Sequence, residues 1–312
     1  MSLLDRILKR KIIIGIHGLA NKPPEKLLKI WWKESIREGF DTIGKPKRPF
    51  RFTLVYWADF IHQRPQDPKE KNKKNHLFLD GPYLPGNSSV YAAFTPSNVK
   101  KRILEKLEEN LDRKFFEEKS IINYDSFSNL VIRKLFKDLD FYYNKSCPVP
   151  RYADLNAMQA IRERLASVLR KHRGKEILLI AHSMGTIVSY DVLTQAVPDV
   201  KIHTFITIGS PLALPVIKKK ICGEQGRDCD EHTKLPAPEN IEKAWYNFSD
   251  LNDPIAINYN LADDYRMNSR GIEPIDIVIY NNYEYEGKRD AHKSYGYTRA
   301  PEVARVMRDF LG

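Results

Sequence analysis

The sequence predicts an α/β fold built on a doubly wound, mostly parallel sheet of about six strands, with a helical insertion. Two observations carry this prediction. Six aliphatic, β-branched runs of strand length each end in turn residues, and helical patterns separate most of them. The runs are apolar almost throughout instead of alternating with polar residues, which is typical of strands covered by helices on both faces.

The expected strands lie at 11–18, 51–60, 176–183, 203–211, 243–250 and 274–281. The expected helices lie at 23–40, 155–173, 186–197 and 301–311. Proline stands near the start of the first and last helices, and Gly174 follows the second, as at ordinary helix starts and stops. We expect a single domain over 1–312, with its core in 11–60 and 151–312.

The alternation of strands and helices is interrupted between 61 and 150. The Pro- and Lys-rich stretch "HQRPQDPKEKNKKNH" opens this segment, and two charged helical stretches follow later in it. We interpret 61–150 as an insertion, or cap, that covers one end of the sheet. A second, shorter loop insertion is expected at 215–242.

The chain has a formal net charge of +11, from 51 Lys and Arg against 40 Asp and Glu. These charges are interleaved, as in "RILEKLEENLDRKFFEEK", so a solvated basic surface is expected and no nucleic-acid partner. Leu3, Leu4, Ile7 and Leu8 would share one face of a short helix, so we expect at most weak association with an anionic membrane surface. The apolar run at 12–16 is too short for a signal segment or a membrane span, which predicts a cytoplasmic protein.

Three cysteines are too few for a disulfide scaffold at this length. Cys222 and Cys229 lie close to His232, as in a metal clip or a disulfide, but the spacing fits no standard zinc pattern. Free thiols in a loop are therefore the expectation. Because no Walker loop, G-x-G-x-x-G after a strand or H-E-x-x-H is present, we expect no cofactor and no metal.

Ser183 lies where the expected strand "EILLIA" meets the helix "TIVSYDVL". Ala181 and Gly185, two residues to either side, leave room for a sharp turn that would expose the serine oxygen. The usual pattern is G-x-S-x-G, and Ala181 departs from it by one methyl group. A hydroxyl becomes a nucleophile only when a base removes its proton and a third group orients that base, so the prediction needs two partners.

This strand–serine–helix arrangement resembles the nucleophile elbow of the α/β-hydrolase family, which places an acid and then a histidine later in the chain. The resemblance implies Asp253, in "DLNDPIA", as the acid. Asp250 is the second candidate, and Asp263 and Asp264 are weaker ones. It implies His292, after the last expected strand, as the base. If the strands follow the order of the family, the first strand of this chain corresponds to the third strand of the family. The two N-terminal strands of the family would then be missing, which leaves a minimal sheet of six.

The oxyanion formed during catalysis needs N–H donors. The first is expected from Met184, directly after the nucleophile. The second is expected from the loop "IHGLANKPP". Resemblance to lipases and esterases with an H-G-x loop points to Leu19, with Gly18 turning the backbone and His17 orienting the loop.

The predicted function is a serine hydrolase that cleaves a carboxylic ester, either a small-molecule or a lipid ester, through an acyl-enzyme on Ser183. An acyltransferase or a thioesterase would use the same triad, so these alternatives stay open. A third alternative is a binding protein that keeps the hydrolase fold without turnover.

Overall fold

The computed structural model describes residues 10–45, 49–106, 139–143, 145–230 and 232–312. Its centre is a six-stranded sheet in the order β2-β1-β3-β4-β6-β8. Every neighbouring pair in this sheet is parallel. The prediction of an α/β fold on a doubly wound parallel sheet of six strands is confirmed.

The strands of the main sheet are β1 (Lys11–Ile16), β2 (Phe52–Val55), β3 (Glu176–His182), β4 (Ile202–Ile208), β6 (Ile241–Ser249) and β8 (Pro274–Val278). Two small sheets lie outside it, formed by β5 (Leu235–Pro236) with β7 (Tyr265–Arg266) and by β9 (Glu284–Tyr285) with β10 (Lys288–Arg289). All six expected strands are present. The expected strand at 51–60 is shorter, since a 3-10 turn at Ala58–Phe60 follows β2.

The helices are α2 (Glu25–Thr42), α5 (Ala157–Lys171), α6 (Met184–Asp191), α7 (Pro215–Glu224), α8 (Ser294–Arg299) and α9 (Pro301–Leu311). The helix expected at 186–197 begins at Met184 and continues after Asp191 as a π-helical turn, Val192–Ala196. Helix α8 was not expected, because Pro301 marks only the start of α9. The four expected helices are otherwise where the sequence places them.

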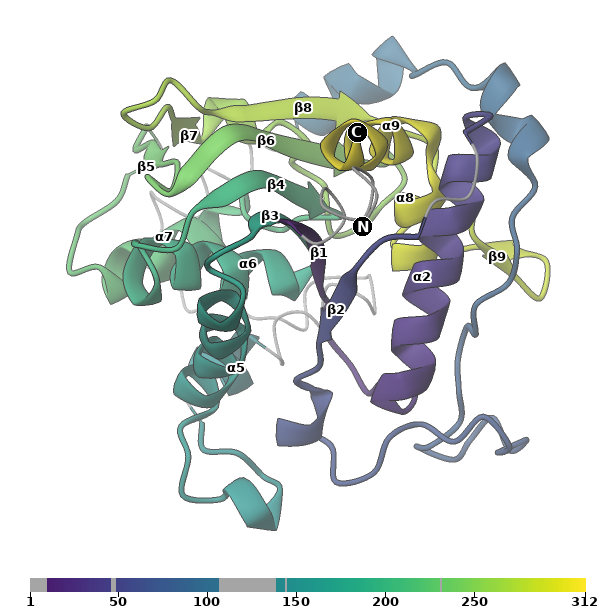
Figure 1. Ribbon diagram of the computed structural model, residues 1–312, viewed down its shortest axis with the longest axis horizontal. Helices are drawn as coiled ribbons and strands as arrows, with labels where there is room; N and C mark the ends of the chain where they lie inside the picture. Colours follow the sequence, from purple (N-terminus) through teal and green to yellow (C-terminus); the bar gives the residue numbers. More distant parts are fainter. Residues whose placement is uncertain (1–9, 46–48, 107–138, 144, 231) are drawn as a thin grey trace.

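Helices cover both faces of the sheet (Figure 1). Side chains of β1 alternate between two apolar clusters. Ile12, Ile14 and Ile16 pack with α5, α6 and α7, whereas Ile13 packs with α2 and α9. Strands buried on both faces need apolar residues at successive positions, which explains the continuous run "KIIIGI".

Residues 77–87 belong to the first half of the expected insertion, and we call them the strap. In Figure 1 it is part of the blue segment that runs along the outer side of α2. Glu38 of α2 accepts hydrogen bonds from the Tyr83 hydroxyl (3.0 Å) and the Gly86 amide (2.5 Å). Arg299, at the end of α8, donates to the Leu84 carbonyl at 2.6 Å. Segments far apart in the sequence therefore hold the strap against the core.

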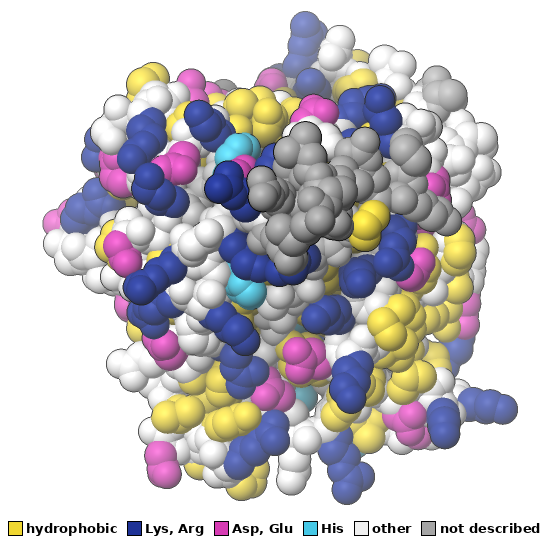
Figure 2. Space-filling model, in the orientation of Figure 1, with side chains coloured by type: hydrophobic (Ala, Val, Ile, Leu, Met, Phe, Trp, Pro, Cys, Tyr) yellow, Lys and Arg dark blue, Asp and Glu magenta, His cyan; other side chains and the backbone are white. Residues whose placement is uncertain are grey.

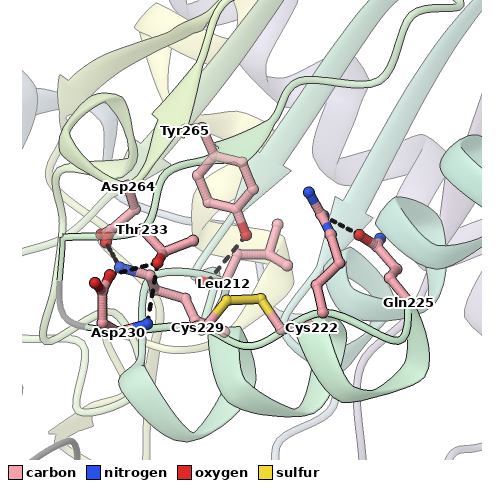
Figure 3. Close-up of a disulfide and its surroundings, with 10 residues drawn as sticks. Leu212, Cys222, Gln225, Cys229, Asp230, Thr233, Asp264 and Tyr265 are labelled. Atoms are coloured by element: carbon pink, nitrogen blue, oxygen red, sulfur yellow. Dashed lines mark hydrogen bonds and ion pairs between the residues drawn. A yellow bond between two sulfur atoms is a disulfide. The ribbon is translucent and has the colours of Figure 1, made fainter.

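The segment 215–242 is more ordered than the expected loop, because it contains α7 and β5. The expectation of free thiols in this segment is wrong. Cys222, near the end of α7, forms a disulfide with Cys229, and their Cα atoms lie 6.1 Å apart (Figure 3). The chain reverses after α7, which brings the two side chains together in a way that spacing alone does not reveal. Cys147 is the free, buried cysteine.

In the described part of the chain, no helix is both long and apolar enough to cross a membrane. The expected short helix carrying Leu3, Leu4, Ile7 and Leu8 lies outside the described residues, as does most of the second half of the 61–150 insertion. On the face drawn in Figure 2, the Lys and Arg side chains are spread widely, and Asp and Glu side chains lie among them.

Candidate active site

Ser183 lies between the end of β3 and the first residue of α6 with φ 56° and ψ −129°. A non-glycine residue rarely has a positive φ, so this backbone is strained. The surrounding hydrogen bonds hold it in place, because the Ser183 amide donates to the Ile208 carbonyl (3.1 Å) and the Thr186 amide donates back to the Ser183 carbonyl (2.8 Å). The sharp strand-to-helix turn expected from the sequence is present.

Ser183, His292 and Asp253 form one hydrogen-bonded chain. His292 Nδ1 lies 2.9 and 2.8 Å from the two carboxylate oxygens of Asp253. Since an ionised carboxylate only accepts, Nδ1 carries the hydrogen, and Nε2 is free to accept from the Ser183 hydroxyl at 3.0 Å. The geometry is that of a nucleophile, a base and an orienting acid.

The Asp253 carboxylate is buried and has several further donors. Oδ1 accepts from the Ile255 amide at 2.8 Å, and Oδ2 accepts from the Tyr297 hydroxyl at 2.7 Å. The Tyr297 oxygen in turn accepts from the Asp250 amide at 3.0 Å, so its single hydrogen is directed to Asp253. Burial and the adjacent Asp253 charge raise the pKa of Tyr297 well above its usual value, which keeps that hydrogen in place.

Gly209, after β4, lies directly against this acid–base pair. Its φ is +54°, and a Cβ atom there would be 2.7 Å from Asp253 Oδ2 and 3.1 Å from His292 Nδ1. Any side chain at this position would displace one of the two groups. Glycine is required here both for the conformation and for the space.

The competing acids are engaged elsewhere. Asp250 accepts from the Asn281 amide at 2.6 Å and pairs with Arg289, which gives it a structural role beside the site. Asp264 forms a buried ion pair with Lys218. Asp263 accepts from an asparagine three residues earlier. Among the four candidate acids, the structure brings Asp253 to His292.

His182, next to Ser183, contacts the backbone of His292. Its Nε2 lies 2.7 Å from the His292 carbonyl, which can only accept, so Nε2 carries the hydrogen. Burial is the main cause that lowers the pKa of His182 well below its usual value, and the neighbouring His292 lowers it further. The ring therefore stays neutral while it fixes the loop that carries His292.

The loop after β1 is fixed by His17. The Trp57 amide donates to His17 Nε2 at 3.0 Å, so Nε2 is the acceptor and Nδ1 carries the hydrogen, which it donates to the Gly18 carbonyl at 2.7 Å. The ring stacks on Trp57 with centroids 4.9 Å apart. Burial lowers the pKa of His17 well below its usual value, so the imidazole is neutral. It is thus placed to orient the loop and not to act as a base.

Two glycines allow this loop to approach the nucleophile. A Cβ atom on Gly18 would lie 2.5 Å from Ser183 Cβ, and one on Gly185 would lie 2.8 Å from the His17 carbonyl oxygen. The predicted oxyanion donors, the amides of Leu19 and Met184, lie in this loop and directly after Ser183. Neither donates to a protein acceptor within the described residues. An oxyanion needs N–H donors without other acceptors, so the role of these two amides stays a prediction.

Ser183 opens into a cavity of about 290 Å³. One wall comes from the loop after β1 and the first turns of α2, with Leu19, Leu28 and Trp32. The other comes from His182, Ile255 and Tyr295, and residues of the strap close the remaining side. Lys22 and Lys293 line the cavity together with Asp80 and Asp290, so two positive and two negative side chains surround it.

Two residues that follow β2, Trp57 and Asp59, have structural partners. Trp57 supports His17, as described above, and lies behind the loop. Asp59 pairs with Arg151 (3.4 Å) and Arg164 (3.3 Å), so it is an ion-pair partner at the strand end.

Sequence reasoning missed Tyr297, Gly209 and the contribution of the strap to the cavity. Gly209 carried a usable signal, because it lies near the carboxyl end of the strand expected at 203–211, on the side where the other site loops lie. Tyr297 carried none, since it belongs to a tyrosine-rich stretch in which every tyrosine looked alike.

Comparison with known proteins bears on the segment that carries the nucleophile. Residues 152–225 match the family described as PGAP1-like alpha/beta domain. No curated protein sequence matches the chain. The matched segment runs from α5 to α7 and contains Ser183, whereas Asp253 and His292 lie beyond it. With its six-stranded parallel sheet between two layers of helices, the chain has the α/β-hydrolase fold, and its segment 152–225 is similar to a hydrolase-type family.

Proposed function

We propose that the protein is a serine hydrolase that cleaves a carboxylic ester through an acyl-enzyme on Ser183. The observation that carries this proposal is the chain of hydrogen bonds from Asp253 through His292 to Ser183, with the serine at the wall of a cavity. A serine, a base and an acid in this geometry are the parts that acyl transfer requires.

In the first half of the reaction, His292 Nε2 takes the Ser183 proton while Oγ attacks the ester carbonyl carbon. The carbonyl oxygen becomes an oxyanion, which accepts from the amides of Leu19 and Met184. Asp253 stabilises the imidazolium that forms and keeps its Nδ1 hydrogen directed inward. The imidazolium then protonates the leaving alcohol, and the C–O bond to that alcohol breaks.

In the second half, His292 removes a proton from water, which attacks the acyl-enzyme carbonyl. The same amides hold the second oxyanion, and its collapse returns the proton to Ser183 Oγ and releases the carboxylic acid. An alcohol or an amine in place of water would give acyl transfer by the same steps.

The balanced charges around the cavity favour a neutral or zwitterionic small ester over a strongly acidic one. The scattered lysines and arginines favour weak contact with an anionic membrane surface at most, as the net charge already suggested. If the protein does not sediment with anionic vesicles even at low salt, this contact is excluded.

A fluorophosphonate probe tests the nucleophile directly. We expect the probe to label the wild-type protein, Ser183→Ala to abolish labelling, and the same variant to lower the hydrolysis of model esters about 10⁴-fold or more. Ser167→Ala, which changes an exposed serine on α5, is the matched control and should label like the wild type. Labelling that persists in Ser183→Ala would exclude Ser183 as the nucleophile.

A further inference from the structure

Residues 79–86 of the strap are held in place by side chains and not by backbone pairing. They form no helix or strand, and none of them makes a backbone–backbone hydrogen bond with another described residue. A segment without such bonds takes its position from the other groups that bind it. The position of this part of the strap therefore depends on a few side-chain contacts.

Three carbonyl groups of the strap, at every second residue, accept hydrogen bonds from one stretch of the chain, 283–299. The pairs are Asp80 with Lys293 Nζ (3.0 Å), Pro82 with the Tyr283 hydroxyl (2.6 Å) and Leu84 with the Arg299 guanidinium (2.6 Å). The strap is thus attached to the same stretch that carries His292, the base of the proposed triad.

The near end of the strap is also a wall of the cavity beside Ser183. Residues 79–81 line this cavity, and its volume of about 290 Å³ is near the lower end of the range for ligand pockets. Leu28 and Trp32, which line it from α2, belong to the buried core and cannot move without disturbing the packing of α2 on the sheet. An ester larger than the cavity is therefore accommodated most easily by displacement of the strap.

We propose that the strap limits the size of the ester that the site accepts, and that Tyr283 and Glu38 are positioning residues that set this limit. The inference rests on the proposed function and names its substrate class, an ester compact enough to fit the cavity while the strap stays in place. Glu38 contributes through the bonds it accepts from the Tyr83 hydroxyl and the Gly86 amide. Neither Tyr283 nor Glu38 lines the cavity, so both act on the substrate through the strap.

The hydrogen bonds to the strap should penalise large esters alone. A large ester must displace the strap and break these bonds before it reaches Ser183, whereas a small ester binds with every bond intact. If a mutation removes one of the bonds, the penalty on large esters falls by the contribution of that bond, and small esters gain nothing. The ratio of kcat/KM for large esters to that for small esters therefore measures how firmly the strap is bound.

The first test uses Tyr283→Phe, which removes the hydroxyl that binds the Pro82 carbonyl and keeps the ring. Nitrophenyl esters of acids of increasing chain length form one series, and esters of one short acid with alcohols of increasing size form the other. Because each ester is compared between variant and wild type, its intrinsic reactivity cancels. In at least one series we expect the ratio, taken from the largest and the smallest esters that the wild type hydrolyses, to rise about threefold to tenfold, as one neutral hydrogen bond implies.

Tyr190→Phe is the matched control for this variant. The hydroxyl of Tyr190 also donates to a proline carbonyl, that of Pro236, at 2.8 Å, and Tyr190 does not line the cavity. Its ratio should equal the wild-type ratio even if the variant is less stable. Equal ratios in Tyr283→Phe and Tyr190→Phe, in both series, would overturn the inference.

The second test loosens the strap from α2. Glu38→Ala should raise the ratio in the same series as Tyr283→Phe, because it removes the acceptor of two bonds from the strap. Glu34→Ala, one turn earlier on α2, is its control, since Glu34 pairs with Arg37 and should leave the ratio unchanged. Fluorophosphonate labelling shows whether each variant folds, and if Tyr283→Phe does not, Glu38→Ala decides in its place.

These outcomes separate the inference from the proposed function. If Ser183 is labelled and small esters are hydrolysed while the ratio stays at its wild-type value, the strap does not set the limit and the hydrolase stands. If no ester is hydrolysed and Ser183 is not labelled, the proposed function fails and the inference fails with it.

Discussion

Replacing Tyr297 by phenylalanine would remove one oxygen that connects the acid of the triad to the backbone. In the wild type this hydroxyl donates to Asp253 Oδ2 at 2.7 Å and accepts from the Asp250 amide at 3.0 Å. Both neighbours are buried, so water does not readily replace the lost group. In the proposed reaction Tyr297 is a positioning residue, because it would act through Asp253.

The magnitude follows from the type of bond. A hydrogen bond to a charged group contributes about 1.5 to 3 kcal/mol, and part of that stabilises the carboxylate. Without this bond the Asp253 carboxylate is less well stabilised by its other partners and attracts a protonated His292 more strongly. In the proposed reaction His292 must be neutral to act as the base, so the acid limb of the kcat/KM profile should move to higher pH. The free energy of unfolding should fall by about 1 to 3 kcal/mol, because the Asp250 amide loses its acceptor.

The assay is the pH dependence of ester hydrolysis, measured together with urea unfolding. Tyr190→Phe is the matched control, since this buried tyrosine on α6 donates to the Pro236 carbonyl at 2.8 Å and does not contact the triad. It should lose stability without any change in the profile. A Tyr297→Phe profile that superimposes on the wild type, with lower stability alone, would refute the positioning role.

Three further predictions concern the loop, the disulfide and a buried histidine. Gly18→Ala should lower ester hydrolysis about a hundredfold, because the added Cβ would lie 2.5 Å from Ser183 Cβ and must displace it. Cys222 and Cys229 should resist alkylation in denaturant until a reductant is added, and reduction should lower the free energy of unfolding by about 2 to 3 kcal/mol. The folded state holds His17 neutral, with a pKa below its ordinary value of 6.5, while the unfolded chain takes up a proton there. Stability should therefore fall as pH drops below about 6.5, by up to about 1.4 kcal/mol per pH unit for this residue, and His17→Gln should reduce that slope in thermal melts.

Each of these has a control or a contrary outcome. Gly174→Ala places its Cβ in open space and should leave activity unchanged. Cys147, the free cysteine, should be alkylated in denaturant without reductant, and labelling of all three cysteines there would contradict the disulfide. A slope of stability against pH that is the same with and without His17 would contradict its neutral burial.

The disulfide also bears on where the protein works. The short apolar run near the N-terminus predicts a cytoplasmic protein, and that remains a prediction. Disulfides are rare in cytosolic proteins and common in oxidising compartments. The pairing of Cys222 with Cys229 therefore favours an oxidising compartment, and alkylation of protein taken directly from cells would decide between the two.

The order of the fold was predictable because parallel strands buried on both faces leave a continuous apolar signal. The choice of Asp253 and His292 as partners of Ser183 came from the resemblance to the α/β-hydrolase order of nucleophile, acid and histidine. The preference for Asp253 over Asp250 also came from the resemblance. The structure adds the physical difference, which is that Asp250 is occupied by Arg289 and the Asn281 amide.

The disulfide, the strap and the role of Tyr297 could not be predicted, because each depends on contacts between segments that no sequence pattern connects. The disulfide required the turn after α7 to bring Cys229 back to Cys222, and spacing carries no information about that turn. The strap required Glu38 of α2 to meet Tyr83, two residues that no periodicity connects. Tyr297 required α8, a six-residue helix whose start has no capping side chain to announce it.

The position of β1 in the sheet has a consequence for how the protein folds. Lys11 at the start of the described chain lies beside Glu176, and β1 fills the place between β2 and β3. Pairings so distant in sequence form slowly, because a long loop must close before any contact compensates for its lost entropy. During synthesis β1 cannot pair with β3 until the ribosome has released residues 176–182. The loop that carries Leu19 can meet Ser183 only after that closure, so the proposed esterase activity should appear during refolding only once β1 has docked, and should lag behind helix formation.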